Sequence, residues 1–443
     1  MQPSYSAYAQ TFRCIGPDCE DTCCSGWNVP VDQPTYEKYQ SLPAGPLRTL
    51  ISDSVVKIEQ SAPSGKDSGN TPIFAQILMN SANQCPMLTG ERLCRIQGEL
   101  GPEMLAHTCA TYPRIVHQVG GLKETALTLS CPEAARLVLL SPDFLSLGLG
   151  TDEPNGPPSA EVQVALVEPE DASTKENMQP LPPDFFAIRE SVLAIIQMHS
   201  YPLWQRIFLV GLLCRRLDSI VQGESDKGVS EFIASFKTAV ATGSLRPSLE
   251  TLPVDGAAQL DIVLRLAGLM LHRSNVTPRF AATIQAFTTG VGNGPGASLE
   301  SLTRQYTLAY DTWFEPFFRR HPYILENYVI NTIVRCQFPF GREGMAVGAI
   351  PQMAQEFAKL TAQFALTRGL LVGVAGFHGA LFSSEHVILT VQSAAKHFEH
   401  HPEFLKLAHE LLMERQMDGA RGTAILLRNV GKEETTTAPS PRP

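Results

Sequence analysis

The sequence has little charge and no excess of positive charge. Charged residues make up 18% of the 443, and 35 lysines and arginines stand against 44 acids, which gives a net charge of −9 at pH 7. A chain with this balance has no general attraction to the phosphates of nucleic acid or to an anionic membrane surface. We therefore expect no nucleic-acid partner. Because 44% of the residues are hydrophobic, the composition is that of a folded globular protein.

Features of export and membrane insertion are also lacking. Residues 1–10 contain neither a basic cluster nor an apolar run, so they do not resemble a secretory signal. The longest nearly unbroken apolar stretch, 369–382, is shorter than the roughly 18 residues that span a bilayer, and it contains His378. We therefore expect a cytoplasmic protein without a membrane span, in which thiols stay reduced.

Standard catalytic motifs are missing as well: there is no P-loop, no Gly-x-Ser-x-Gly and no His-Glu-x-x-His. One glycine-rich stretch, Gly369–Gly379, lies inside an apolar, helix-like run and has no lysine that could anchor a phosphate. We interpret its glycines as points of close helix packing or of a bend. The sequence thus identifies no catalytic residue and no site for a cofactor of the nucleotide type.

What the sequence does have is an uneven distribution of cysteine. Eight of the ten cysteines lie in the first 131 residues, where a C-x4-C-x3-C-C run is followed by a C-x8-C pair and two single cysteines. In a reducing compartment so many thiols favour metal ligation over disulfides, and thiolates select zinc or iron–sulfur clusters. The eight candidate metal ligands are Cys14, Cys19, Cys23, Cys24, Cys85, Cys94, Cys109 and Cys131.

Spacing leaves both kinds of metal centre open but favours the cluster. The first three cysteines are spaced as in zinc knuckles, whereas eight residues separate Cys85 from Cys94, which is too long for a tight knuckle. Proline follows both Cys85 and Cys131 and stiffens the chain where a ligand leaves a cluster. The motif of the radical S-adenosylmethionine enzymes would need a cysteine at the position of Gly26, so that class is excluded.

Beyond the cysteine region the pattern is helical. Apolar residues recur at helical spacing after Asp184, which we expect to be the N-cap, and again over 260–271 and 324–334. Ser383 can cap a further helix, and Cys214 lies on an apolar face where we expect a buried, inert thiol. We predict a mainly α protein with an irregular Cys-rich metal-binding domain over 1–147, a Pro- and acid-rich linker over 148–183, an α-helical bundle domain over 184–430 and a disordered tail over 431–443.

Several short motifs surround the cysteines. They read FRCIG from Phe12, DCEDTCCSGW from Asp18, CPML from Cys85, LCRIQ from Leu93, CATYPR from Cys109 and LSCPE from Leu129. Two stretches of the helical part, 326–339 and 396–400, belong with them. Together these motifs resemble the flagellin lysine-N-methylase family, FliB, and the broader group of CxxxCC-type zinc- or iron-chelating domains.

This resemblance implies S-adenosylmethionine-dependent N-methylation of lysine side chains on a protein, either flagellin or another surface protein. It also implies a Cys-ligated [4Fe-4S] cluster, for which the eight cysteines are the candidate ligands. One cluster takes four of them, and the sequence does not say which four, so a second site or a structural zinc stays open. Ala110 departs from the pattern, because we would expect a basic residue between the cysteine and Thr111.

Methylation of lysine needs the neutral amine, so the site should desolvate the ammonium and offer a base. Glu133, Tyr112 and Glu326 carry suitable groups, and the sequence does not choose among them. Two other functions stay open. A non-catalytic zinc- or iron-chelating or sensing protein would explain the missing methyl-donor loop. A secreted, disulfide-stabilised domain would need the export signal that residues 1–10 do not supply.

Overall fold

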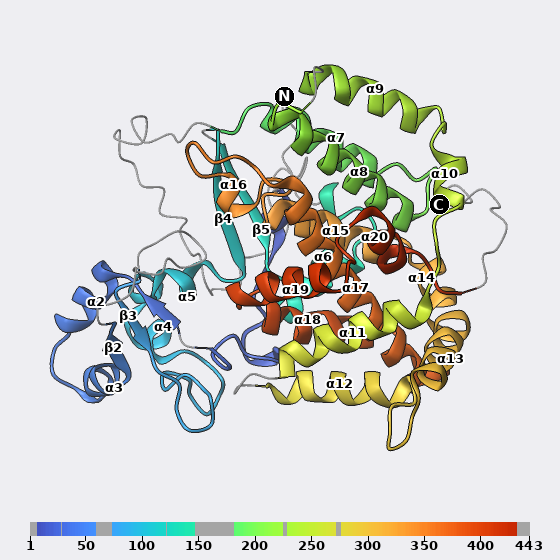
Figure 1. Ribbon diagram of the computed structural model, residues 1–443. Helices are drawn as coiled ribbons and strands as arrows, with labels where there is room; N and C mark the ends of the chain where they lie inside the picture. The colour runs from blue at the N-terminus through green and yellow to red at the C-terminus, as the bar shows by residue number, and fades with distance from the viewer. Residues whose placement is uncertain are drawn as a thin grey trace. The chain divides into compact units, whose positions relative to one another are not determined.

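The computed structural model describes residues 7–27, 29–58, 73–120, 122–146, 181–224, 228–271 and 276–431. They form two compact units, which we describe separately (Figure 1). The first contains the described residues up to 137 together with 143–146, and the second contains 138–142 and the described residues from 181 onward. The predicted linker and the predicted tail lie almost entirely outside the described residues, so these domain boundaries stay predictions.

In the first unit a small antiparallel sheet is covered by short helices. Strand β3 (Ala75–Ile77) lies between β1 (Val29–Val31) and β2 (Val55–Lys57). Ile77 is in register with the first residue of both neighbours. Because side chains alternate between the two faces of a strand, the first and third residues of β1 and of β3 are buried, while the middle residues are partly accessible.

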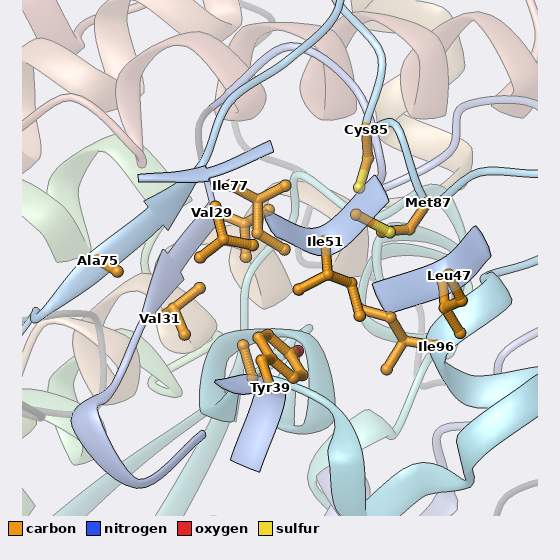
Figure 2. Packing of buried hydrophobic residues seen from close by; sticks show 12 residues of the cluster. Val29, Val31, Tyr39, Leu47, Ile51, Ala75, Ile77, Cys85, Met87 and Ile96 are labelled. Carbon is orange, nitrogen blue, oxygen red and sulfur yellow. The ribbon is translucent and has the colours of Figure 1, made fainter. Parts of the chain in front are cut away.

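Two helices cover the buried face of this sheet. They are α2 (Gln33–Gln40) and α3 (Pro46–Ser54), and they contribute the fully buried side chains of Tyr39 and Ile51. Figure 2 shows these side chains facing the valines of the sheet, with Cys85 at the edge of the same cluster and its sulfur directed inward. The apolar core of the first unit therefore borders directly on one of the predicted metal ligands.

A hairpin forms the second sheet of this unit. Strands β4 (Arg114–Val119) and β5 (Leu122–Leu127) pair along their whole length. The turn between them contains Gly120 at a φ of +56°, a left-handed conformation that favours glycine. The remaining helices of the N-terminal region are α1 (Ala7–Thr11), α4 (Arg95–Leu100), α5 (His107–Thr111) and α6 (Pro132–Leu140).

The second unit is a helical bundle built around α17 (Met353–His378), which is buried along most of its length and packs against α8, α11, α12, α13, α18, α19 and α20 (Figure 1). The other helices of the unit are α7 (Phe185–Ile196), α8 (Leu203–Val221), α9 (Val229–Ala241), α10 (Arg246–Glu250), α11 (Gly256–Leu271), α12 (Pro278–Gly290), α13 (Leu299–Ala309), α14 (Glu315–Arg320), α15 (Tyr323–Arg335), α16 (Gly341–Gly344), α18 (Ser384–Phe398), α19 (Pro402–Glu414) and α20 (Ala420–Leu427).

By length and composition alone, the segment Met353–Leu381 could cross a membrane, with a mean hydropathy of 1.4. However, 67% of its most apolar stretch is buried inside the protein. The apolar run 369–382 is thus mainly the second half of a helix of 26 residues, longer than the sequence suggested. Contacts with the surrounding helices explain its composition, and α17 is the core helix of the bundle.

Glycines set the distance between α17 and α12. A Cβ on Gly373 would lie 2.7 Å from the main-chain oxygen of Phe287, and a Cβ on Gly290 would lie 1.8 Å from the oxygen of Gly373. Neither position can carry a side chain unless the backbone moves. The interpretation of the glycine-rich stretch as a close packing surface is therefore confirmed.

The end of α20 is held from the side by two buried residues. Arg368, on α17, donates hydrogen bonds to the main-chain oxygens of Leu426, Leu427 and Arg428. Gln259, on α11, donates to the oxygen of Ile425 at 2.8 Å. The last carbonyls of a helix have no partner within the helix itself, and here side chains from two core helices supply the donors.

The predicted fold class is confirmed, and so are the helices expected over 260–271 and 324–334. The predicted cap at Ser383 is also present, since its N–H is bound by His386 Nδ1 at 3.1 Å. The cap predicted at Asp184 is also present in part. Cys214 is fully buried in α8, as expected.

Candidate cysteine centre

All eight predicted metal ligands lie in the first unit, and none of the ten cysteines forms a disulfide. The side chains differ in exposure. Cys85 and Cys131 are buried, whereas Cys14, Cys23 and Cys109 are exposed and the other three are half-buried. The structure thus gives no support to a disulfide-stabilised domain. Within the unit the eight thiols divide into two neighbourhoods, which we call the inner and the outer set.

The inner set borders the apolar cluster. The N–H of Cys85 donates to the oxygen of Cys24 at 2.8 Å, and an isolated bridge pairs Leu88 with Cys94. All three cysteines pack against the cluster, either as members or at its margin. The fourth thiol comes from α5, which packs on β1. The inner set consists of Cys24, Cys85, Cys94 and Cys109.

Burial makes the inner thiols weak acids. It is the main cause that raises the pKa of Cys85 to about 12, and it also raises the pKa values of Cys94 and Cys109. A negative charge on Cys24 raises all three further, so Cys24 lies within electrostatic range of each of them. At neutral pH these three thiols are therefore protonated, and a metal that binds them must displace protons.

The outer set lies among charged residues. Cys14 and Cys19 flank a short 3-10 turn, and the thiol of Cys19 donates to the oxygen of Asp21 at 3.3 Å. The carboxylate of Glu20 pairs with Arg136 on α6, the helix that begins directly after the fourth member of the set. This ion pair holds the two ends of the set together. The outer set consists of Cys14, Cys19, Cys23 and Cys131.

Two aromatic residues connect the outer thiols. The Trp27 Nε1–H donates to the oxygen of Cys23 at 3.0 Å, and the indole ring lies 6.3 Å from the ring of Tyr112. The hydroxyl of Tyr112 is hydrogen bonded to Ser130, which directly precedes Cys131, at 3.0 Å. Burial, with the nearby thiols, raises the pKa of Tyr112 well above its usual range. Tyr112 is therefore protonated at neutral pH and is not suited to act as a base.

In the part of the chain that the structure describes, no three His, Cys, Asp or Glu side chains are grouped closely enough to hold a metal ion. The chemistry of the donors nevertheless suits a thiophilic centre, because each set supplies the four thiols that a tetrahedral zinc ion or an iron–sulfur cluster uses. His107, which could have joined them, instead donates its N–H to Asp32 from an exposed position.

In the helical unit the structure identifies a buried ion pair that the sequence did not reveal. Glu326 on α15 contacts Arg206 on α8 at 2.7 Å and His199 at 2.9 Å. Only 8% of the Glu326 side chain and 6% of the Arg206 side chain are exposed. The carboxylate proposed as a base is thus engaged by a cation. Glu133 is similarly paired with Arg136, at 3.1 Å.

A second buried pair joins the two helical stretches that carry the resemblance. Arg335, at the end of α15, lies 3.3 Å from Glu399, and their side chains are 9% and 2% exposed. Gln363 on α17 also accepts from Arg335 at 3.4 Å. A sequence pattern cannot reveal such pairs, because their members lie on different helices and neither one stands out beside its neighbours.

Comparison with known proteins places the helical unit. Residues 189–426 match the family described as the FliB lysine N-methylase C-terminal domain. The chain belongs to the FliB lysine N-methylase family. This confirms the resemblance found in the sequence, and the enzyme class of the family is the one predicted. The match begins after the cysteine region, so it does not test the assignment of metal ligands.

Individual members of the FliB family match about a third of the chain. The flagellar biosynthetic protein FliU of Salmonella muenchen is 34% identical over 143 residues, which are 32% of this chain and 79% of that protein. The lysine-N-methylases of Salmonella typhimurium and Salmonella choleraesuis are each 33% identical over 142 residues. The matched region spans only 33% of the length of these two proteins. No solved structure gives a significant match.

Proposed function

We propose that the chain is a cytoplasmic S-adenosylmethionine-dependent methyltransferase that modifies lysine side chains of a protein, and that cysteines of its N-terminal region hold a [4Fe-4S] cluster. The match of residues 189–426 to the lysine N-methylase domain carries this proposal. The names of the curated relatives, one flagellar and two lysine-N-methylases, support flagellin or another surface protein as the substrate.

In such a reaction the neutral lysine amine attacks the methyl group of the sulfonium. A nitrogen–carbon bond forms, the carbon–sulfur bond breaks, S-adenosylhomocysteine leaves, and one proton passes from the amine to a base or to water. The electrons stay paired throughout, so the transfer needs no redox partner. When bound, the cluster would supply thiolate-bound iron that fixes the cysteine segments in place.

Of the three groups considered as the base, none is poised for that role in the structure. The raised pKa of Tyr112 keeps its hydroxyl protonated. Glu326 and Glu133 are each held by an arginine, and a neighbouring cation favours the ionised form of a carboxylate and so weakens it as a base. We infer that Glu326 positions α15 against α8 and that the proton leaves by another route.

A binding and transfer experiment tests the function. Protein purified without oxygen should bind labelled S-adenosylmethionine saturably and should transfer the label to lysines of flagellin or of another surface protein, as located by peptide mass spectrometry. The same acceptor with acetylated lysines is the control and should stay unlabelled. A metal-loaded protein that binds no S-adenosylmethionine would refute the proposal and would favour the non-catalytic zinc- or iron-chelating or sensing protein.

A further inference from the structure

We propose that the first unit holds two separate metal centres, each bound by four cysteines: an inner centre at Cys24, Cys85, Cys94 and Cys109, and an outer centre at Cys14, Cys19, Cys23 and Cys131. The ligand at each is a thiophilic metal, either iron in a cluster or zinc. This inference does not rest on the methyltransferase function, because it concerns the number and place of the metals.

Stoichiometry is the first argument. A tetrahedral zinc ion or a [4Fe-4S] cluster takes four thiolates, so eight thiols in one small unit are twice what one centre needs. All eight lie in the same unit, while the two remaining cysteines lie in the helical unit, where Cys214 is fully buried in the core. The surplus is therefore concentrated where the first four ligands are.

Separate sets of contacts are the second argument. The inner thiols are joined through the Cys85–Cys24 backbone hydrogen bond and the bridge between Leu88 and Cys94. The outer thiols are joined through the pairing of Glu20 with Arg136 and through the contacts of Trp27 and Tyr112. These two groups of contacts share no residue. Electrostatic effects follow the same division: charges on Cys14 and Cys19 act on Cys131, and a charge on Cys24 acts on the other inner thiols.

Cys23 and Cys24 are where the two sets meet. Their thiols are hydrogen bonded to each other, and Cys23 also lies within electrostatic range of Cys14 and Cys109. We assign Cys23 to the outer centre for two reasons. Its carbonyl is held by Trp27, whose ring lies near Tyr112 on the outer side, and Cys24 already completes the four inner thiols. Adjacent residues thus serve different centres.

The two surroundings predict different lability. Inner thiols border an apolar cluster that includes Ile51 and Met87, and such a shell limits the access of solvent and chelators. Outer thiols lie beside Glu20, Asp21 and Arg136, and Cys14 is exposed. A chelator should therefore remove metal in two phases, with the outer centre emptied first.

The test counts metals in the full-length chain purified without oxygen. Iron, zinc and acid-labile sulfide are measured per chain in the wild type, in C14S and in C109S. Each substitution removes one exposed ligand, from the outer and the inner set respectively, so neither opens a buried cavity. C336S, in the helical unit, is the matched control. Far-UV circular dichroism confirms that each variant is folded.

We expect the wild type and C336S to hold two centres, seen as about eight iron with eight sulfide, about four iron with one zinc, or two zinc. C14S and C109S should each lose one centre and keep the other, and the double variant should lose both. One centre in the wild type would overturn the proposal. Loss of all metal from a folded C14S, or loss of the same centre from both variants, would also overturn it, since either result means that the eight thiols share one site.

Discussion

At the scale of single residues, the Glu326–Arg206 pair shows why a buried charge needs its partner. Both side chains are nearly inaccessible and belong to different helices. Removing one partner of such a pair leaves the other charge buried without compensation, at a cost of about 3 kcal/mol or more. The pair therefore fixes the distance between α8 and α15.

We predict that Glu326→Ala lowers the free energy of unfolding by about 3 kcal/mol, as measured by urea denaturation. Glu300→Ala is the matched control, because Glu300 and Arg304 form an exposed pair at 3.6 Å. Exposed pairs contribute little, so the control should change stability by less than about 1 kcal/mol. Equal effects of the two substitutions would mean that the buried pair does not stabilise the fold.

The cysteines show how far sequence reasoning reaches at this scale. Composition and spacing identified all eight as candidate ligands, because thiol chemistry depends on residue type. Spacing could not divide them into sets, since the two sets interleave along the chain: Cys24 joins residues more than sixty positions further on, while Cys23 joins neighbours on both sides. Only the backbone pairing of Cys24 with Cys85 reveals the division.

At the scale of secondary-structure elements, the contact between α12 and α17 depends on glycine. A methyl group on Gly373 would lie 2.4 Å from the ring of Phe287 and 2.7 Å from its main-chain oxygen. Overpacking of this kind forces backbone shifts that cost about 1–3 kcal/mol. The helices can approach this closely only while the position has no side chain.

Gly373→Ala should therefore lower the melting temperature and the free energy of unfolding, by about 2 kcal/mol. Gly268→Ala is the control, because Gly268 lies in α11 and a Cβ there has no neighbour within 4 Å. In the absence of a clash, alanine in a helix stabilises by about 0.5–1 kcal/mol. The expected opposite signs distinguish packing from helix propensity, and a stabilised Gly373→Ala variant would contradict the close contact.

Helices were predicted better than strands, for a physical reason. The helical pattern of 324–334 repeats within a few residues, so it is visible locally. Strands β1, β2 and β3 have only three residues each, and their partners lie far apart in the chain. A strand so short shows no alternation that could be read. The cap at Asp184 failed for a similar reason, because backbone conformation and not residue type decides whether a carboxylate reaches the first N–H groups.

At the scale of the whole helical unit, the last helix is tied to the first core helices. Arg368 is 2% exposed and holds the final carbonyls of α20, and Gln259 holds another from α11. A buried carbonyl that loses its donor costs about 1–3 kcal/mol. These contacts connect helices that are widely separated in the sequence.

We predict that Arg368→Leu destabilises the unit by at least about 2 kcal/mol and increases hydrogen exchange in α20 more than in α12. Arg265→Leu is the control, since Arg265 is partly exposed on α11 and pairs only with Asp261 one turn away. It should leave exchange in α20 unchanged. Uniform loss of protection across all helices would mean that Arg368 supports the core as a whole and does not hold α20 specifically.

The tie between α20 and the core also sets the order in which the chain can fold during synthesis. Arg368 and Gln259 emerge from the ribosome well before residues 425–428, whose carbonyls they bind. Until those residues appear, two polar side chains of the core have no acceptors at their final places. The cysteine-rich unit precedes them and can acquire its metals earlier. The helical unit therefore completes its core only when nearly all of the described chain has been made.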